Sequence, residues 1–169
     1  GTRLALDSIW QRQLQTIEVE SNDKAAVNQF YGALYHASFL PRTMSDVEKA
    51  PNGARYPLFA NENIIRTLQK PVYGDFSMWD IYRAQLPLLN IIDSKRTSDM
   101  MSSLANMYFA GGWMPIFPCW NSYTAAMIGD HTGSAIADAT VKGVNGFDLK
   151  LAYEGLWQNA FESPQTMEE

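Results

Sequence analysis

A pattern of helix, loop and helix recurs three times along this chain, at a spacing of roughly 50 residues, as in proteins built from stacked helical pairs. Apolar residues at helical spacing predict six helices, at about 4–18, 25–38, 77–92, 95–109, 123–142 and 149–161. No strand-rich segment competes with them. Stacked helical hairpins build bundles, solenoids or α/α toroids. The pattern therefore predicts an all-α fold.

Several helix ends carry clear signals. Asp93 or Ser94 is expected to cap the fourth helix, and Asp148 the sixth. Gly111-Gly112 should end the fourth helix. Pro87 lies inside the third, where we expect a kink because proline removes a backbone hydrogen bond.

Two long loops precede the third and fifth helices. The first, at 40–74, is interrupted by prolines and is expected to contain at most a short hairpin between 64–68 and 71–73. The second spans 113–121, and the tail at 163–169 should be frayed. In a toroid such loops gather at one end of the inner helices and form a pocket. That arrangement would bring these residues to one rim: Asp75, Trp79, Asp80, Asn121, Tyr123 and Asp130.

Composition narrows the class of protein. The 169 residues are 46% hydrophobic and 18% charged, with a net charge of −5. These values exclude a disordered chain, and the absence of a basic run argues against nucleic-acid binding. No run of 18 apolar residues is present, so we predict no membrane span. The single cysteine, Cys119, excludes an internal disulfide and is expected to be buried.

The segment 75–83 concentrates groups that bind sugars. Carboxylates hydrogen-bond to neighbouring hydroxyls, and aromatic faces pack against the C–H faces of a sugar ring. Asp80 is the strongest candidate, with Trp79 beside it and Arg83 three residues on, on the same helical face. Two simpler interpretations remain: Asp80 and Arg83 form an intrahelical ion pair, and Asp75 is only the N-cap of the third helix.

Asp130 and His131 lie in the fifth predicted helix, whose small residues should let another helix approach closely. A lone histidine in such a helix is more often a core or pairing residue than a ligand. No complete metal-binding motif and no nucleophile elbow are present. Glycoside hydrolysis needs paired carboxylates. The internal candidates are Asp75, Asp80, Asp130 and Asp138, and their sequence context shows none with a raised pKa.

At these residues the chain resembles a known family, the calcium-dependent exo-α-mannosidases of glycoside hydrolase family 92. The resemblance covers about residues 4–160. It rests on an ordered series of motifs, which is far more specific than any one of them. The matching stretches are 30–36, 41–47, 75–89, 107–115, 127–131, 136–139 and 142–143.

The family implies an (α/α)6 toroid that hydrolyses terminal α-linked mannose with inversion, and a bound calcium ion. Six helices would form about half of that toroid. The aspartate of the family's Phe-Ser-hydrophobic-Trp-Asp motif contributes to the mannose subsite, which carries over to Asp80 and, more weakly, to Trp79. Asp130 and His131 match a family motif without a firm role.

The resemblance also marks departures. The family's general acid, its base and its calcium ligands lie in downstream motifs that this sequence does not contain, and residues 48–55 look like an insertion. No catalytic residue and no metal ligand is therefore assigned here. We interpret the whole chain, residues 1–169, as one partial catalytic domain, inactive alone, with α-mannosides or mannose-rich glycans as ligands. The family resemblance suggests a periplasmic or secreted location.

Two other hypotheses stay open. In the second hypothesis the chain is a stand-alone carbohydrate-binding or interaction module of the same fold, without hydrolase activity. Part of a toroid leaves helix faces uncovered, so such a module should form a homodimer or bury those faces by rearrangement. In the simplest alternative the aromatic residues are all core and the domain binds no ligand.

Overall fold

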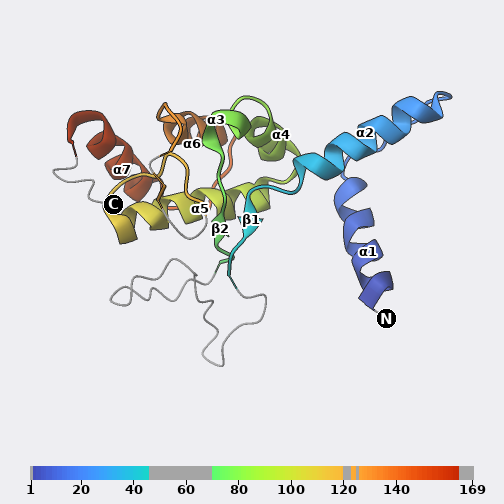
Figure 1. Ribbon diagram of the computed structural model, residues 1–169, viewed down its shortest axis with the longest axis horizontal. Helices are drawn as coiled ribbons and strands as arrows, with labels where there is room; N and C mark the ends of the chain where they lie inside the picture. Colours follow the sequence, from blue (N-terminus) through green and yellow to red (C-terminus); the bar gives the residue numbers. More distant parts are fainter. Residues whose placement is uncertain (1, 46–69, 120–122, 125, 164–169) are drawn as a thin grey trace. The chain divides into compact units, whose positions relative to one another are not determined.

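The computed structural model describes residues 2–45, 70–119, 123–124 and 126–163, and the chain divides into two compact units, residues 1–40 and 41–169. The elements of the described residues are α1 (Thr2–Leu14), α2 (Lys24–Ala37), β1 (Arg42–Thr43), β2 (Tyr73–Gly74), α3 (Met78–Ile81), α4 (Gln85–Ile92), α5 (Ser94–Gly111), α6 (His131–Val141) and α7 (Leu149–Phe161) (Figure 1). The predicted all-α class is confirmed. Within those residues, no helix combines the length and apolar character needed to cross a bilayer.

The first unit is a pair of helices joined by a capped turn. The Asp23 carboxylate accepts hydrogen bonds from the backbone N–H groups of Ala25 and Ala26 at 2.9 and 3.1 Å, which satisfies two of the free donors at the start of α2. Trp10 of α1 packs edge-on against Tyr35 of α2, with ring centroids 4.5 Å apart. Aromatic contact therefore holds a pair in which α1 buries no residue.

The second unit is built around α5. This helix is buried from Thr97 to Ala105 and packs against α4, α6, α7 and β2. Its ends follow the sequence signals, because Asp93 caps it and Gly112 closes it in the left-handed conformation, with φ of 79°. The core around it is completed by Phe76, Met78, Leu86, Leu89, Met114, Ile136 and Ala152.

The third predicted helix is interrupted earlier than expected. It divides into α3 and α4, and the break lies at 82–84, where Ala84 adopts φ of −140°. The kink predicted at Pro87 is wrong because Pro87 is the third residue of α4. The first-turn N–H groups of a helix have no intrahelical partner, so proline loses nothing there. The first such bond of α4 runs from Leu88 N to Ala84 O, at 2.9 Å.

The fifth predicted helix is shorter than expected. It was predicted at 123–142, but α6 begins only at His131. Thr124, Met127 and Gly129 all have positive φ, which an α-helix does not allow. The prediction that this helix is central is confirmed, because α6 packs against α3, α4, α5 and α7.

A short sheet ties the two ends of the first long loop together. Arg42 pairs with Gly74 and Thr43 with Tyr73, in antiparallel register. Tyr73 therefore pairs with β1, and the other half of the predicted hairpin, 64–68, lies outside the described residues. Cys119 is buried, as predicted.

Asp138 of α6 joins α6 to α4. Its carboxylate accepts hydrogen bonds from Asn90 Nδ2 and Lys142 Nζ, both at 2.7 Å. Partial burial alone would raise the pKa of Asp138. The bonds from Lys142 and Asn90 and the charge of Lys142 outweigh that effect and lower the pKa below its usual value.

We predict that Asp138→Ala lowers the free energy of unfolding by about 1–3 kcal/mol, because the buried Asn90 amide loses its acceptor. Asp138→Asn keeps an acceptor and is the matched control. A lowered folded-state pKa stabilises the protein above the unfolded value of 3.8, and this contribution is lost as the pH falls through the folded-state pKa. Urea unfolding should therefore show a parent-to-Asn difference that shrinks on acidification. A difference independent of pH would contradict the ionic role.

Candidate functional site

The site is built where α3 meets the first residue of α6. Trp79 lies in α3, Tyr82 and Arg83 directly follow it, and His131 begins α6. Trp79 and Tyr82 are three residues apart and so share one helical face. Sequence analysis singled out Trp79, Arg83 and His131 but missed Tyr82, which the same three-residue spacing could have identified.

His131 is held between two aromatic rings. Its imidazole stacks on Tyr82 with a centroid distance of 4.0 Å and an interplanar angle of 2°, and it lies 5.1 Å from the Trp79 ring. Its Nε2 atom is buried and has no hydrogen-bond partner among the described residues. The expectation that His131 is a core or pairing residue stays a prediction, and the structure places its ring against two aromatic side chains. It orients the two rings that flank it.

Arg83 extends the cluster with a positive charge. Its guanidinium carbon lies 4.6 Å from the centre of the Trp79 ring and 5.4 Å from that of Tyr82, and its Nε donates to Trp79 O at 3.2 Å. These are cation–π distances. Arg83 therefore supports the tryptophan ring while its side chain remains exposed.

Asp80 lies on the exposed side of α3. Its carboxylate accepts a hydrogen bond from the Ser77 hydroxyl, and no ion pair to Arg83 is formed in the described part of the chain. The interpretation of Asp80 and Arg83 as an intrahelical pair is therefore wrong, because Ser77 binds the carboxylate and Trp79 holds the guanidinium. An exposed carboxylate beside a partly exposed indole can accept hydroxyl groups while the ring contacts an apolar face.

Asp130 lies beside His131 at the start of α6. Burial raises the pKa of Asp130, while a hydrogen bond from Asn159 and the charge of His131 act in the opposite direction. Burial, and secondly the charge of Asp130, raise the pKa of Tyr123. The Tyr123 phenol thus keeps its proton and donates to Met114 O.

Asn159 of α7 was not singled out from the sequence. Its side chain exchanges two hydrogen bonds with the Met114 backbone, at 3.1 and 3.2 Å. Asn159 therefore binds both the loop after α5 and the acid at the start of α6. No local pattern marks it, since only the tertiary fold brings α7 to that loop.

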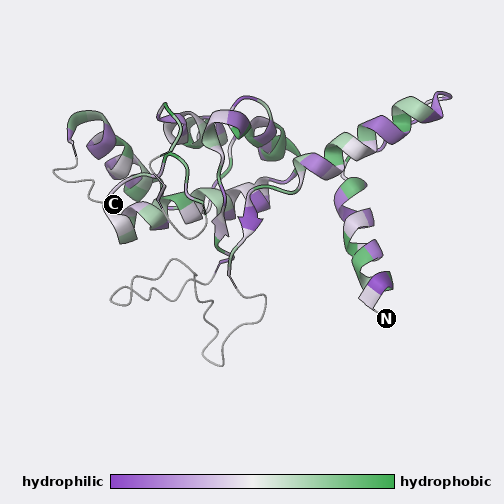
Figure 2. Ribbon diagram, viewed as in Figure 1, coloured by the Kyte–Doolittle hydropathy of each residue, from purple (hydrophilic) through white to green (hydrophobic). Residues whose placement is uncertain are grey.

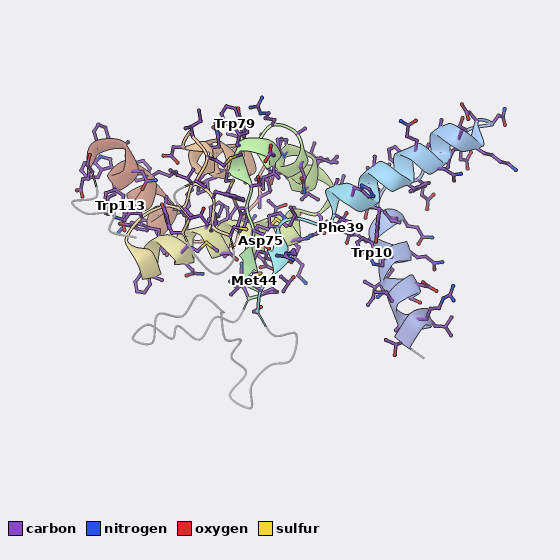
Figure 3. All side chains as sticks on the ribbon, in the orientation of Figure 1. Trp10, Phe39, Met44, Asp75, Trp79 and Trp113 are labelled. Atoms are coloured by element: carbon purple, nitrogen blue, oxygen red, sulfur yellow. The ribbon has the colours of Figure 1, made fainter. Side chains whose placement is uncertain are left out.

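Asp75 is placed differently from the other predicted site residues. It is 4% exposed and forms an ion pair with Arg42 across the small sheet. The alternative that Asp75 caps the third helix is wrong, because Ser77 occupies the N-cap position. Figure 3 shows Asp75 near the sheet and Trp79 at α3. Asn121, also predicted at the rim, lies outside the described residues.

The described residues do not fit a calcium site. Calcium takes six to eight oxygen ligands, and no group of three or more His, Cys, Asp or Glu side chains that could hold a metal occurs among these residues. Asp75 and Asp138 are already bound to Arg42 and Lys142.

Comparison with known proteins identifies the family. The model of the glycosyl hydrolase family 92 catalytic domain matches residues 1–169. The chain belongs to glycoside hydrolase family 92. No curated protein matched it.

Solved family 92 structures share the fold. The α-mannosidase BT3965 from Bacteroides thetaiotaomicron superposes with a TM-score of 0.81 at 28% identity, over 98% of this chain and 22% of that one. A second structure of BT3965, in complex with mannoimidazole, gives the same score and identity, over 21% of its chain. The inverting mannosidase BT2199 from the same bacterium gives 0.81 at 23% identity, over 94% and 21%. The chain thus spans about a fifth of these enzymes, and its helices form part of an α/α toroid.

Gly129 fits closely against the histidine of the site. Its φ is +94°, and a Cβ atom there would lie 2.4 Å from His131 Nε2. Because His131 is packed between Trp79 and Tyr82, it cannot withdraw freely. We predict that Gly129→Ala lowers the free energy of unfolding by about 1–3 kcal/mol, measured by urea unfolding.

The control for that change is Gly32→Ala, in α2, where a Cβ atom would meet no atom within 4 Å. This variant should be neutral or slightly stabilising, since alanine favours helix. Equal behaviour of the two variants would show that the His131 contact is unimportant.

We predict that Asp130→Asn raises stability near neutral pH by about 0.5 kcal/mol, discounted because the carboxyl is partly exposed. A raised folded-state pKa means that the parent loses stability as the pH rises above the unfolded value of 3.8. The amide carries no charge and removes that loss. Thermal unfolding across pH should show the two proteins converging in acid, and a parent more stable at neutral pH would contradict this.

Proposed function

We propose that this chain supplies part of the terminal mannose subsite of a family 92 α-mannosidase, with Asp80 and Trp79 as its main sugar contacts. The observation that carries the proposal is the exposed Asp80 carboxylate next to a tryptophan that Arg83 and His131 hold in place. Membership of the family and the mannoimidazole complex named for BT3965 support the ligand class.

The residues would act on the sugar in distinct ways. Asp80 accepts two neighbouring hydroxyls, and the Trp79 ring packs against the C–H face of the pyranose. Arg83 donates to a further hydroxyl from its place over one face of the indole, because guanidinium groups carry several donors. His131 keeps the rings aligned, and Asp130 extends the polar rim from α6.

We propose that Asp75 acts by positioning the backbone that carries the sugar contacts. Buried and paired with Arg42, it fixes the backbone that leads from β2 into α3. Its φ of 58°, in the left-handed region, turns the chain there. Asp75 would not touch the sugar itself and would act by positioning the residues that follow it.

The proposed reaction is hydrolysis of terminal α-linked mannose with inversion, which needs an acid and a base about 6.5–9.5 Å apart. Asp75 and Asp138 are bound to Arg42 and Lys142, so neither is suited to transfer a proton. We assign the acid, the base and the calcium ligands of the complete enzyme to residues outside this chain. A protonated Glu would donate to the leaving oxygen while an Asp activates water. An exported location is proposed from the family alone.

We predict that the chain binds methyl α-mannoside without hydrolysing an aryl α-mannoside. Asp80→Ala should weaken binding at least about tenfold, or about 1.4 kcal/mol, with an unchanged melting temperature. Saturation-transfer NMR measures binding, and Glu162→Ala, an exposed acid away from the cluster, is the control. Equal loss of binding and stability would make Asp80 structural. Binding that survives Asp80→Ala, or hydrolysis by the chain alone, would overturn the assignment.

A further inference from the structure

The loop at residues 113–119, which follows α5, links the two elements that form the site. The Pro118 carbonyl accepts a hydrogen bond from Phe76 N at 3.2 Å, one residue before the N-cap of α3. The Pro115 carbonyl accepts one from the hydroxyl of Thr132, the second residue of α6. The loop therefore holds the start of α3 and the start of α6, the two helices that carry the ring contacts of the site.

Thr132 binds differently from Thr97, a threonine of α5 that is equally buried. The Thr97 hydroxyl donates to Asp93 O, four residues earlier, at 3.1 Å, which is the usual bond of a threonine in a helix. The Thr132 hydroxyl donates instead to a carbonyl 17 residues away. Both side chains belong to residues that are 0% exposed, so each hydroxyl needs a partner within the protein. The Thr132 bond therefore ties α6 to the loop and does not merely complete a local turn.

Helix α7 binds the same loop through Asn159. The Asn159 side chain accepts from Met114 N at 3.2 Å and donates to Met114 O at 3.1 Å, and it also donates to the Asp130 carboxylate. Hydrophobic positions recur along α7 (Figure 2), and Gly155 lies so close to the loop that a Cβ atom there would come within 2.8 Å of Met114 Cγ. Met114 is itself 0% exposed. One amide thus bridges the buried loop and the acid that directly precedes His131.

We propose that Thr132 and Asn159 are positioning residues of the mannose subsite, because they fix the start of α6 on the loop that also fixes α3. The inference rests on the proposed function for its ligand. His131 lies 5.1 Å from the Trp79 ring and 4.0 Å from the Tyr82 ring, so a displacement of α6 against α3 disturbs this stack. Neither positioning residue touches the sugar. Both preserve the geometry of the side chains that do.

NMR of the imidazole protons tests the role of Thr132 in the full chain without any sugar. Thr132→Val removes the hydroxyl and keeps a β-branched side chain of similar size. An aromatic ring stacked on the imidazole shifts its proton signals upfield, so these signals report on the stack. The sequence has two histidines, His36 and His131, and His36→Gln assigns their signals. At one fixed pH, Thr132→Val should move the His131 signals toward those of an unfolded histidine.

Two further variants separate positioning from a general loss of stability. Thr132→Ser keeps the hydroxyl and should retain the parent signals. Thr97→Val is the matched control, since it removes an equally buried hydroxyl that bonds to its own helix. It should lower stability in urea without moving the His131 signals. His131 signals that stay in place in Thr132→Val, or that move equally in Thr97→Val, overturn the proposal.

The role of Asn159 has its own readout, and the neighbouring amide of α7 is the control. Burial raises the pKa of Asp130 and the hydrogen bond from Asn159 lowers it, so Asn159→Ala should raise it further. Gln158→Ala removes two bonds of the same kind, to Tyr108 and Gly112, and should leave the pKa of Asp130 unchanged. Carbon-13 titration of the carboxyl, assigned with Asp130→Asn, measures it. An unchanged pKa of Asp130 in Asn159→Ala overturns the role of Asn159.

Binding of methyl α-mannoside, measured by saturation-transfer NMR, connects both residues to the subsite. Thr132→Val and Asn159→Ala should each weaken binding about fivefold, less than Asp80→Ala does, because the sugar contacts themselves are retained. The two control variants should leave the affinity unchanged. Unchanged affinity in both positioning variants of a chain that binds overturns the proposal. If the parent chain binds no mannoside, the proposed subsite fails, and the imidazole signals and the carboxyl titration still decide the positioning role.

Discussion

The burial of α5 is the constraint on which the second unit depends. A helix buried from Thr97 to Ala105 must satisfy its own polar side chains, because unbonded polar groups in a core are costly. Ser102 and Ser103 donate to the carbonyls four residues earlier, at 2.8 Å each. Ser103 also accepts from Tyr73 N at 2.9 Å, which fixes β2 on α5. From β2 the chain turns at Asp75 into α3, so this hydrogen bond to α5 helps to place the tryptophan of the site.

Helix existence and helix ends could be predicted because their causes are local. Asp148 and Asp93 cap their helices and Gly112 ends one, as their sequence neighbourhoods indicate. The loop before α6 could not be predicted, because its causes are distant. Tyr123 bonds to Met114 O and Thr124 to Phe117 O, and Met127 is held at φ of 67°. Tertiary contacts there override a run of good helix formers.

The same distinction applies to the site. Spacing along α3 grouped Asp80 with Arg83, whereas in the structure Arg83 lies over the ring of Trp79, and the family motifs pointed to His131. Spacing could not predict which partner each group binds, because the Asp80 carboxylate has two neighbours, Ser77 and Arg83, that could bind it. Ser77 binds it in the structure, and the indole competes for the guanidinium. The choice depends on desolvation and ring orientation, which only the packed α3–α6 contact determines.

Helix α7 connects the core to the site. Asn159 holds the Met114 backbone and binds Asp130, while Ala152 and Gly155 of the same helix are buried in the core. The packing of α7 therefore positions the loop after α5 and the acid at the start of α6. Since His131 follows Asp130 and contacts the Trp79 and Tyr82 rings, the arrangement of the proposed sugar contacts depends on a helix that carries none of them.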